Sequence, residues 1–161
     1  LNMPMEGLIE GAKQYRGLPH RCELIGEVNG VRFIDDSKGT NIGATSAALE
    51  GLAGAGQIWL IIGGQGKGQD FSQLKPVLAR INVRLLVMGE ATAEICAHLG
   101  QEALIDVMSS LEDAVDLSAA SAQPGDIVLL SPACASFDMF SSYVERGERF
   151  QAAVAALEVA A

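Results

Sequence analysis

Basic and aromatic side chains are both scarce in this chain of 161 residues. It contains 11 Lys and Arg against 20 Asp and Glu, which gives a formal net charge of -9, and aromatic residues make up only 5%. Binding to nucleic acid or to an anionic membrane surface requires clustered positive charge, and single strands also need aromatic stacking. The composition therefore argues against nucleic acid and membranes as partners.

Cysteine and histidine are too few and too scattered to suggest a disulfide framework or a metal centre. The three cysteines, Cys22, Cys96 and Cys134, are odd in number, and no CxxC or HxxxH spacing occurs. Such isolated thiols are typical of proteins from a reducing compartment. Apolar runs such as residues 58–62 are much shorter than the roughly 20 residues of a membrane-spanning helix. We expect a cytoplasmic protein without a metal site.

One long stretch has no basic residue at all. Residues 85–145 contain ten acidic side chains and no Lys or Arg, a bias typical of the solvated faces of outer helices. Any bound anion is therefore expected to be held by Arg21, Arg32, Lys38 or Lys67, which all lie in the first half of the chain.

Apolar runs alternate with helical patterns, and 49% of the residues are hydrophobic, enough for one well-buried core. Asn29-Gly30 between two strand-like runs is typical of a β-hairpin, because both turn positions need positive φ. The alternation predicts an α/β fold: a Rossmann-like, doubly wound, mostly parallel sheet of about six strands, with an antiparallel strand at the start and helices on both faces. The expected strands are 22–28, 31–34, 58–62, 84–88, 103–107 and 126–130, and the expected helices are 5–12, 41–52, 70–81, 91–99, 111–121 and 142–157.

Three loops that follow expected strands are rich in small, hydroxylated or cationic residues. They cover residues 35–41, 63–68 and 130–138. The carboxyl ends of parallel strands meet at one edge of a sheet, where backbone amides and small side chains bind anions. Taken alone, each loop also fits a plain turn or a helix cap with solvated side chains. Taken together, the three loops predict one site at this edge.

The charges and hydroxyls of these loops suit a small dicarboxylic acid. Lys38 and Lys67 supply two cations, and Ser131 and Ser136 supply hydroxyls. A charge-assisted hydrogen bond contributes roughly 1.5–3 kcal/mol, so a few of them support weak to moderate binding. No arrangement of a nucleophile with a general base is evident. We therefore expect the site to orient a charged small molecule while another domain performs the chemistry.

The glycine-rich loop at residues 63–68 matches neither common nucleotide-binding pattern. A Walker loop has Gly and then Ser or Thr where this chain has Ile61 and Gly68, and the GxGxxG pattern would require glycine at Gln69. We expect a flexible loop that presents Lys67 to a carboxylate as a point charge.

The chain resembles the Mur ligases, and in particular their D-glutamate-adding members. The resemblance implies a C-terminal, D-glutamate-binding domain over residues 17–161, preceded at residues 1–16 by the end of an ATPase domain. The segments that carry the resemblance are residues 17–21, 29–41, 63–67 and 130–138.

The resemblance implies an ATP-dependent ligase of peptidoglycan synthesis, in which ATP and Mg²⁺ serve the full-length enzyme. ATP would phosphorylate the carboxylate of UDP-N-acetylmuramoyl-L-alanine, and the amine of D-glutamate would attack the acyl phosphate. By matching motifs, Lys38 is implied to be catalytic, near the transferred phosphate. The residues implied to bind D-glutamate are Thr40, Lys67, Ser136, Phe137 and Tyr143, and those implied to bind the nucleotide are His20, Arg21 and Asp36.

Some family features differ or are missing. Gln65 stands where relatives often have Asp, and Tyr143 stands where Phe is expected. The ATP loop, the Mg²⁺ ligands and the UDP-binding domain are not in this chain. The fragment is therefore expected to bind no cofactor by itself and to be inactive alone, and the enzyme is expected to be a monomer.

Two alternatives to this interpretation stay open. One is a related ligase domain of the folylpolyglutamate type that takes another acceptor amino acid, and residues 131–138 argue against it. The other is a non-catalytic nucleotide-binding Rossmann module, which predicts a GxGxxG loop after the first strand that this chain lacks.

Overall fold

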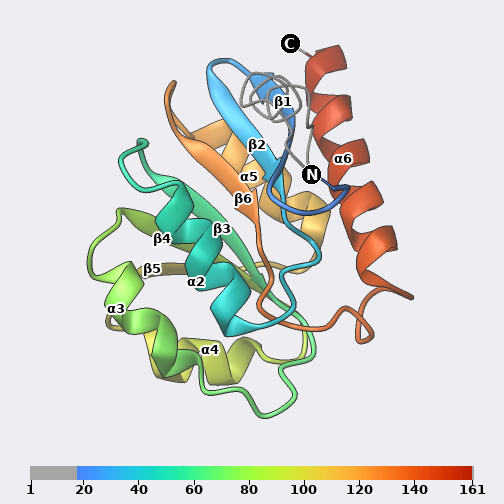
Figure 1. The fold of residues 1–161 in the computed structure, drawn as a ribbon. Helices are drawn as coiled ribbons and strands as arrows, with labels where there is room; N and C mark the ends of the chain where they lie inside the picture. The colour runs from blue at the N-terminus through green and yellow to red at the C-terminus, as the bar shows by residue number, and fades with distance from the viewer. Residues whose placement is uncertain (1–17, 161) are drawn as a thin grey trace, which may run out of the picture.

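The structure, a computed structural model, describes residues 18–160 and arranges six strands in one sheet (Figure 1). The strands are β1 (Glu23–Val28), β2 (Val31–Asp35), β3 (Ile58–Gly63), β4 (Val83–Met88), β5 (Leu104–Val107) and β6 (Ile127–Leu130). They lie in the order β1-β2-β6-β3-β4-β5. β1 and β2 are antiparallel, and every other neighbouring pair is parallel. The predicted Rossmann-like sheet with its antiparallel start is confirmed.

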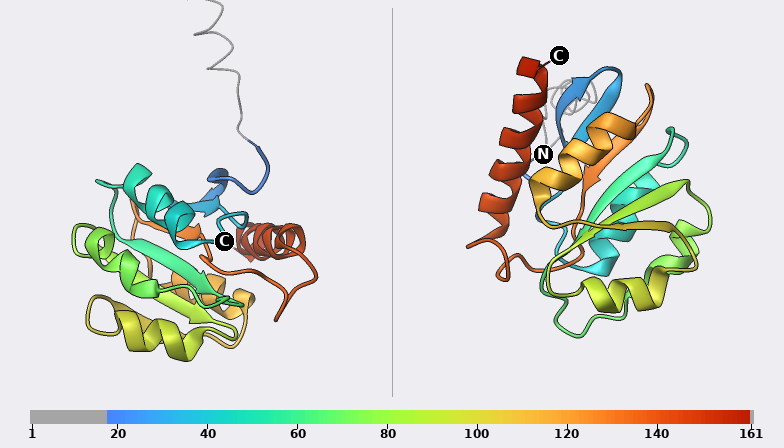
Figure 2. Two further views of the ribbon diagram at one scale, coloured as in Figure 1. Left: turned by 60° about the horizontal axis from the view of Figure 1, so that its bottom comes forward. Right: turned by 180° about the vertical axis from the view of Figure 1, so that it is seen from behind.

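Helices cover both faces of the sheet, as predicted. The helical elements are α2 (Ile42–Gly51), the 3-10 turn η1 (Phe71–Leu74), α3 (Lys75–Leu78), α4 (Thr92–Leu99), α5 (Leu111–Ser121) and α6 (Tyr143–Ala160). α2, η1, α3 and α4 pack on one face, and α5 and α6 pack on the other (Figure 2). Successive side chains of a strand point to opposite faces, so Ile58, Leu60 and Ile62 of β3 join one apolar core and Trp59 and Ile61 join the other.

Local sequence signals predicted most element boundaries to within a few residues. Asn29 and Gly30 have φ values of 52° and 78° and form the tight turn between β1 and β2. Asn41 and Ser110 each accept a hydrogen bond from a backbone N–H three residues later, and they cap α2 and α5. These side chains satisfy amides that the first helical turn leaves unpaired.

The helix expected over residues 70–81 is divided into η1 and α3. The Asp70 carboxylate accepts a hydrogen bond from Ser72 N and caps the start of the 3-10 turn. Pro76 lies in the first turn of α3, a position where its missing N–H costs little.

Two expectations lie outside the described residues. These are the helix at residues 5–12 and the domain boundary after residue 16. Within residues 18–160, no helix is both long enough and apolar enough to cross a membrane.

Candidate functional site

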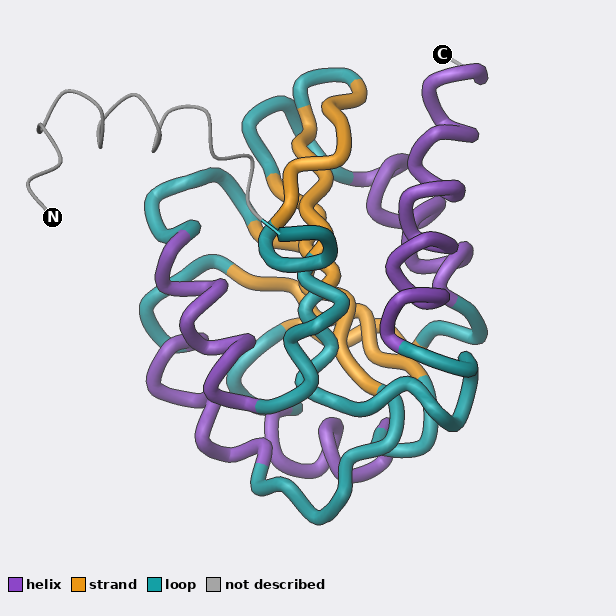
Figure 3. Tube along the Cα trace, turned by 45° about the vertical axis from the view of Figure 1, so that its right-hand side comes forward, coloured by secondary structure: helices purple, strands orange, loops and turns teal. Residues whose placement is uncertain are grey.

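Three loops from different strands meet at the carboxyl edge of the sheet (Figure 3). They are the first loop (residues 36–41, after β2), the second loop (residues 64–70, after β3) and the third loop (residues 131–142, after β6). Gln65 and Ala135 join the second and third loops as an antiparallel bridge, with N···O distances of 2.9 and 3.1 Å. Ala133 N donates to Gly39 O at 2.9 Å and joins the third loop to the first. The predicted convergence of these loops is therefore present.

A pocket of about 160 Å³ opens between the three loops. Pockets for drug-sized ligands are about 300–1,000 Å³, so this one suits a smaller molecule. The structure brings together all five residues that the sequence motifs assigned to the acceptor amino acid. The lining residues are Thr40, Lys67, Ala135, Ser136, Phe137 and Tyr143.

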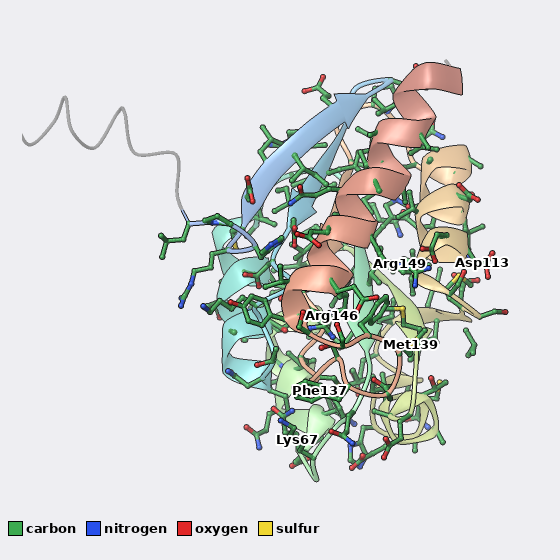
Figure 4. The ribbon with its side chains drawn as sticks, turned by 90° about the vertical axis from the view of Figure 1, so that its right-hand side faces the viewer. Lys67, Asp113, Phe137, Met139, Arg146 and Arg149 are labelled. Carbon is green, nitrogen blue, oxygen red and sulfur yellow. The ribbon has the colours of Figure 1, made fainter. Side chains whose placement is uncertain are left out.

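Two exposed lysines lie against aromatic rings of the pocket. Lys67 Nζ is 5.9 Å from the centroid of the Phe137 ring, and Figure 4 shows both side chains at the end of the molecule where the loops lie. Lys38 Nζ is 5.0 Å from the ring centroid of Tyr143 and 3.2 Å from its hydroxyl oxygen. Cation–π attraction keeps ammonium groups near such rings. Both cations are thus held beside the pocket and are free to turn toward a bound anion.

Ser136 forms the buried floor of the pocket. Its exposed fraction is 2%, and its carbonyl accepts hydrogen bonds from Met139 N at 3.1 Å and Phe140 N at 2.8 Å. These bonds close a turn that fixes the position of the serine. Because the residue also lines the pocket, the floor offers a hydroxyl in a defined place.

A buried cation, Arg146 of α6, joins the first and third loops (Figure 4). Its exposed fraction is 0%. The guanidinium donates to Ser37 Oγ at 3.0 Å, to Ser37 O at 2.8 Å and to Cys134 O at 3.2 Å. Burial lowers the pKa of Arg146 to about 10, so it remains charged at neutral pH.

Sequence reasoning missed Arg146. The sequence analysis considered cations only as anion-binding groups, and Arg146 instead supports the site from the last helix through hydrogen bonds to two loops. A signal was present in the pattern, since Arg146 lies between Tyr143 and Phe150 on the apolar stripe of α6. A charged residue on a stripe that otherwise faces the core indicates a buried hydrogen-bonding role.

Ser131 does not line the pocket, although it was a candidate for binding an anion. Its hydroxyl donates to Asp36 Oδ2 at 2.7 Å and also lies 3.1 Å from Thr45 Oγ1. Asp36 Oδ1 accepts a further hydrogen bond from Cys22 N at 3.3 Å, and burial raises the pKa of the Asp36 carboxyl. A side chain at Gly39 would overlap this pair, so both residues shape the first loop from inside.

His20 and Arg21, the other residues assigned to the nucleotide, lie in different places: His20 lies beside Tyr143, and Arg21 lies at the surface. His20 is buried, its Nδ1 is 2.7 Å from Asp35 Oδ2, and its ring meets that of Tyr143 edge to face with centroids 6.2 Å apart. Arg21 is exposed. The His20 imidazole therefore contacts residues that support the site, while the Arg21 guanidinium is accessible to a ligand.

His20, Glu23 and Asp35 form the one cluster of potential metal ligands found within residues 18–160, with ligand atoms within 4.8 Å of one another. The ligand atoms of Asp35 are already hydrogen-bonded, because its carboxylate also accepts from Gln151 Nε2 at 2.9 Å and from Ser37 N at 2.9 Å. Mg²⁺ demands near-octahedral coordination by oxygen atoms. This cluster does not fit that ion, and we assign Mg²⁺ to none of these residues.

The thiol in the third loop is not a nucleophile. Cys134 is fully buried, and burial raises its pKa to about 12. The thiolate is the reactive form of cysteine, so Cys134 is a packing residue of the apolar core.

Comparison with protein families and curated proteins gives a consistent result. The family profile described as "Mur ligase, glutamate ligase domain" matches residues 20–134. A protein of Chromobacterium violaceum named UDP-N-acetylmuramoylalanine--D-glutamate ligase is 50% identical over 161 residues, which is 99% of this chain and 35% of that protein. A protein of the same name from Acinetobacter baylyi is 47% identical over 98% of this chain and 36% of that protein. The chain therefore spans about a third of the length of these relatives.

Solved structures share the fold at low sequence identity. A bifunctional folylpolyglutamate synthase/dihydrofolate synthase from Yersinia pestis has a TM-score of 0.65 at 19% identity, covering 98% of this chain and 35% of that one. The UDP-N-acetylmuramate-alanine ligase MurC of Thermotoga maritima has a TM-score of 0.61 at 12% identity, covering 99% of this chain and 34% of that one. Fold similarity alone does not identify a substrate.

Proposed function

This chain belongs to the Mur ligase family, and from that premise we propose that residues 17–161 form the domain of a ligase that binds D-glutamate. The complete enzyme would use ATP to convert the carboxylate of UDP-N-acetylmuramoyl-L-alanine to an acyl phosphate. The amine of D-glutamate would attack the acyl carbon, and phosphate would leave as the amide forms. This reaction is a step of peptidoglycan synthesis.

The pocket between the three loops is the observation that carries this proposal. It has a volume of about 160 Å³ and is lined by the ammonium side chain of Lys67 and by three hydroxyl-bearing side chains, those of Thr40, Ser136 and Tyr143. Carboxylates accept hydrogen bonds from such donors, and the charged donor contributes most. A small dicarboxylic acid suits a pocket whose donors come from three different loops. The names of relatives at 47–50% identity support D-glutamate as that acid.

We assign the two carboxylates of D-glutamate to different loops. Lys67 and Thr40 would hold one of them, and Ser136 with backbone amides near Phe137 would hold the other. The ring of Tyr143 would pack along the carbon chain. Fixing both ends of the molecule would restrict the direction in which its amine points, and such orientation lowers the barrier of a two-substrate reaction.

Lys38 is the proposed catalytic residue. Its ammonium group lies at the Tyr143 side of the pocket, 3.2 Å from the tyrosine hydroxyl. A cation at this place would stabilise the negative charge that develops on the acyl phosphate and on the tetrahedral intermediate. Its exposure leaves it free to reach a second substrate that arrives from another domain.

Arg21, His20 and Asp36 are the proposed nucleotide contacts, and the geometry supports them unequally. Arg21 is exposed and cationic, which suits a phosphate group. His20 is engaged with Asp35, and the Asp36 carboxylate accepts hydrogen bonds from Ser131 and Cys22. A nucleotide that contacted His20 or Asp36 would compete with the hydrogen bonds that these residues already form.

The remainder of the reaction would depend on other parts of the enzyme. Because the chain spans about a third of its relatives, we propose that ATP, Mg²⁺ and the UDP substrate are bound mainly by other domains, one of which ends at residues 1–16. The fragment alone would then be inactive. We also propose that the enzyme is a monomer. We further propose that it is cytoplasmic, in line with three cysteines that form no disulfide.

A panel of acceptor amino acids tests the proposal in the complete ligase. Amide formation would be measured with ATP and UDP-N-acetylmuramoyl-L-alanine, using D-glutamate, D-glutamine and L-glutamate as acceptors. We expect kcat/KM to be highest for D-glutamate, and about 100-fold lower for D-glutamine, which lacks one charge partner for the pocket. Equal use of D-glutamine would contradict a pocket built for two carboxylates.

A further inference from the structure

The side-chain amide of Gln69 forms hydrogen bonds with the start of α2, directly after the first loop, and with the second and third loops. Its Oε1 accepts from Ile42 N, the first amide of α2 after the first loop, at 3.1 Å. Its Nε2 donates to Gly66 O within the second loop at 3.2 Å and to Ala133 O in the third loop at 2.8 Å. One half-buried side chain thus joins segments that are far apart in the sequence.

The chemistry of the three partners fixes the orientation of this amide. Ile42 presents an N–H donor, whereas Gly66 and Ala133 present carbonyl acceptors. The reverse orientation would set the NH₂ group of Gln69 against an N–H and its oxygen against two carbonyls. An amide group is therefore required here, because it combines one acceptor with two donors.

Each of the three bonds ends close to a residue that lines the pocket. Ile42 lies two residues after Thr40, Gly66 directly precedes Lys67, and Ala133 lies three residues before Ser136. The contact with Ala133 falls on a strained segment, because Ala133 has a φ of 56°. Residues other than glycine rarely adopt this backbone conformation. Gln69 therefore helps to hold the walls of the pocket at their present spacing.

We propose that Gln69 is a positioning residue for the acceptor amino acid: it sets the distances between the Thr40, Lys67 and Ser136 donors without touching the ligand. This inference rests on the function proposed above. Gln69 lies outside the segments that carry the family resemblance. The sequence analysis mentions it only because the GxGxxG pattern would require glycine at this position. Losing the three bonds would let the loops move apart, and binding that needs donors from all three loops would weaken first.

Kinetics of the Gln69→Met variant of the complete ligase test this role. Methionine has a similar length and shape but makes none of the three hydrogen bonds. We expect KM for D-glutamate to rise about tenfold, while KM for ATP changes less than about twofold, because misplacement of binding groups by a fraction of an ångström is costly. The midpoint of thermal unfolding is measured for each variant so that a general loss of structure is recognised.

Two further variants make the test specific. Gln73→Met is the matched control, since Gln73 is an exposed glutamine four residues later, and we expect its kinetic constants to equal those of the wild type. Gln69→Glu keeps the acceptor for Ile42 N but loses both donors, and we expect it to raise KM for D-glutamate at least as much as methionine does. The glutamate variant also serves if the methionine variant fails to fold.

Three results would overturn the inference. Gln69 variants with the kinetic constants of the Gln73 control would show that the bonds do not position the pocket. A lower unfolding midpoint with unchanged KM for D-glutamate would assign Gln69 a purely structural role. A wild-type enzyme that forms no product with D-glutamate would refute the proposed function itself, and with it the acceptor role of Gln69. The first two results leave wild-type ligation intact, so the two failures are distinguishable.

Discussion

The floor and the rim of the pocket differ in how they are held. The floor is Ser136, and Arg146 joins the neighbouring loops through Ser37 and Cys134. These four residues have exposed fractions of 0–2% and are fixed by hydrogen bonds of 2.8–3.2 Å. The rim consists of Lys38, Lys67 and Phe137, which are exposed. Both lysines lie against aromatic rings, and Lys38 Nζ also donates a hydrogen bond to the Tyr143 hydroxyl at 3.2 Å. The floor is thus preformed, whereas the rim is free to adjust to a ligand.

This difference separates two tasks of a binding site. A fixed hydroxyl surrounded by buried residues rejects ligands that do not match it, because an unpaired buried polar group is costly. Exposed ammonium groups attract anions over a longer range but discriminate little among them. We therefore expect changes in the floor to affect folding and selectivity, and changes in the rim to affect affinity without affecting folding.

Arg146→Met gives the largest expected effect, because it removes the cation beneath the floor. Ser37 and Cys134 would lose a charged donor inside the protein, and we expect the free energy of unfolding of this chain to fall by about 3 kcal/mol. Chemical denaturation measures the change. Arg149→Met is the control on the same helix, since its exposed ion pair with Glu112 contributes about 1 kcal/mol or less. Equal effects of the two substitutions would contradict a special role for the buried cation.

Lys67→Met tests the rim. Losing a charge-assisted hydrogen bond of about 1.5–3 kcal/mol corresponds to a rise of about 10- to 100-fold in KM for D-glutamate in the complete ligase. The free energy of unfolding should change by less than about 0.5 kcal/mol, because the side chain is exposed. Lys75→Met, which removes a half-buried lysine paired with Glu102, serves as control. A large loss of stability in the Lys67 variant would erase the distinction between floor and rim.

Arg21→Ala probes a cation of the first half of the chain that lies outside the pocket lining. We expect KM for ATP to rise about tenfold and KM for D-glutamate to change less than about twofold, because its exposed guanidinium is assigned to a phosphate group. Initial rates with each substrate varied in turn provide both constants. Exchange of the two effects between Arg21 and Lys67 would refute both assignments.

Tyr143→Phe gives the smallest expected effect. It removes the hydroxyl that lies 3.2 Å from Lys38 Nζ but keeps the ring that lines the pocket. An exposed contact of this kind contributes little, so we expect kcat to change by about twofold and KM for D-glutamate to remain the same. A loss of kcat greater than about tenfold would mean that the hydroxyl holds Lys38 in its working position.

The strand pattern and the turn signals predicted the fold and the place of the site. Hydrophobic periodicity identified every strand within residues 18–160, and the rule that carboxyl ends of parallel strands share an edge predicted that the three loops would meet. The assignment of Thr40, Lys67 and Ser136 to the acceptor amino acid came from the family resemblance. These inferences depend on local patterns and on topology, which a single sequence carries.

The hydrogen-bonding partners within the site were not predictable in the same way. Arg146 was overlooked because an arginine on a terminal helix is usually solvated, and its partners Ser37 and Cys134 lie in other loops. Ser131 was considered as a ligand group, yet its hydroxyl points inward to Asp36. Whether a hydroxyl faces a pocket or a buried carboxylate depends on contacts between segments that are remote in the sequence.

The most direct test of the account is a crystal structure of the complete ligase with D-glutamate bound. We predict that one carboxylate of the amino acid lies within hydrogen-bonding distance of Lys67 Nζ and Thr40 Oγ1, and that the other lies beside Ser136 Oγ. D-glutamate bound away from these three side chains, or held through a single carboxylate, would contradict the account.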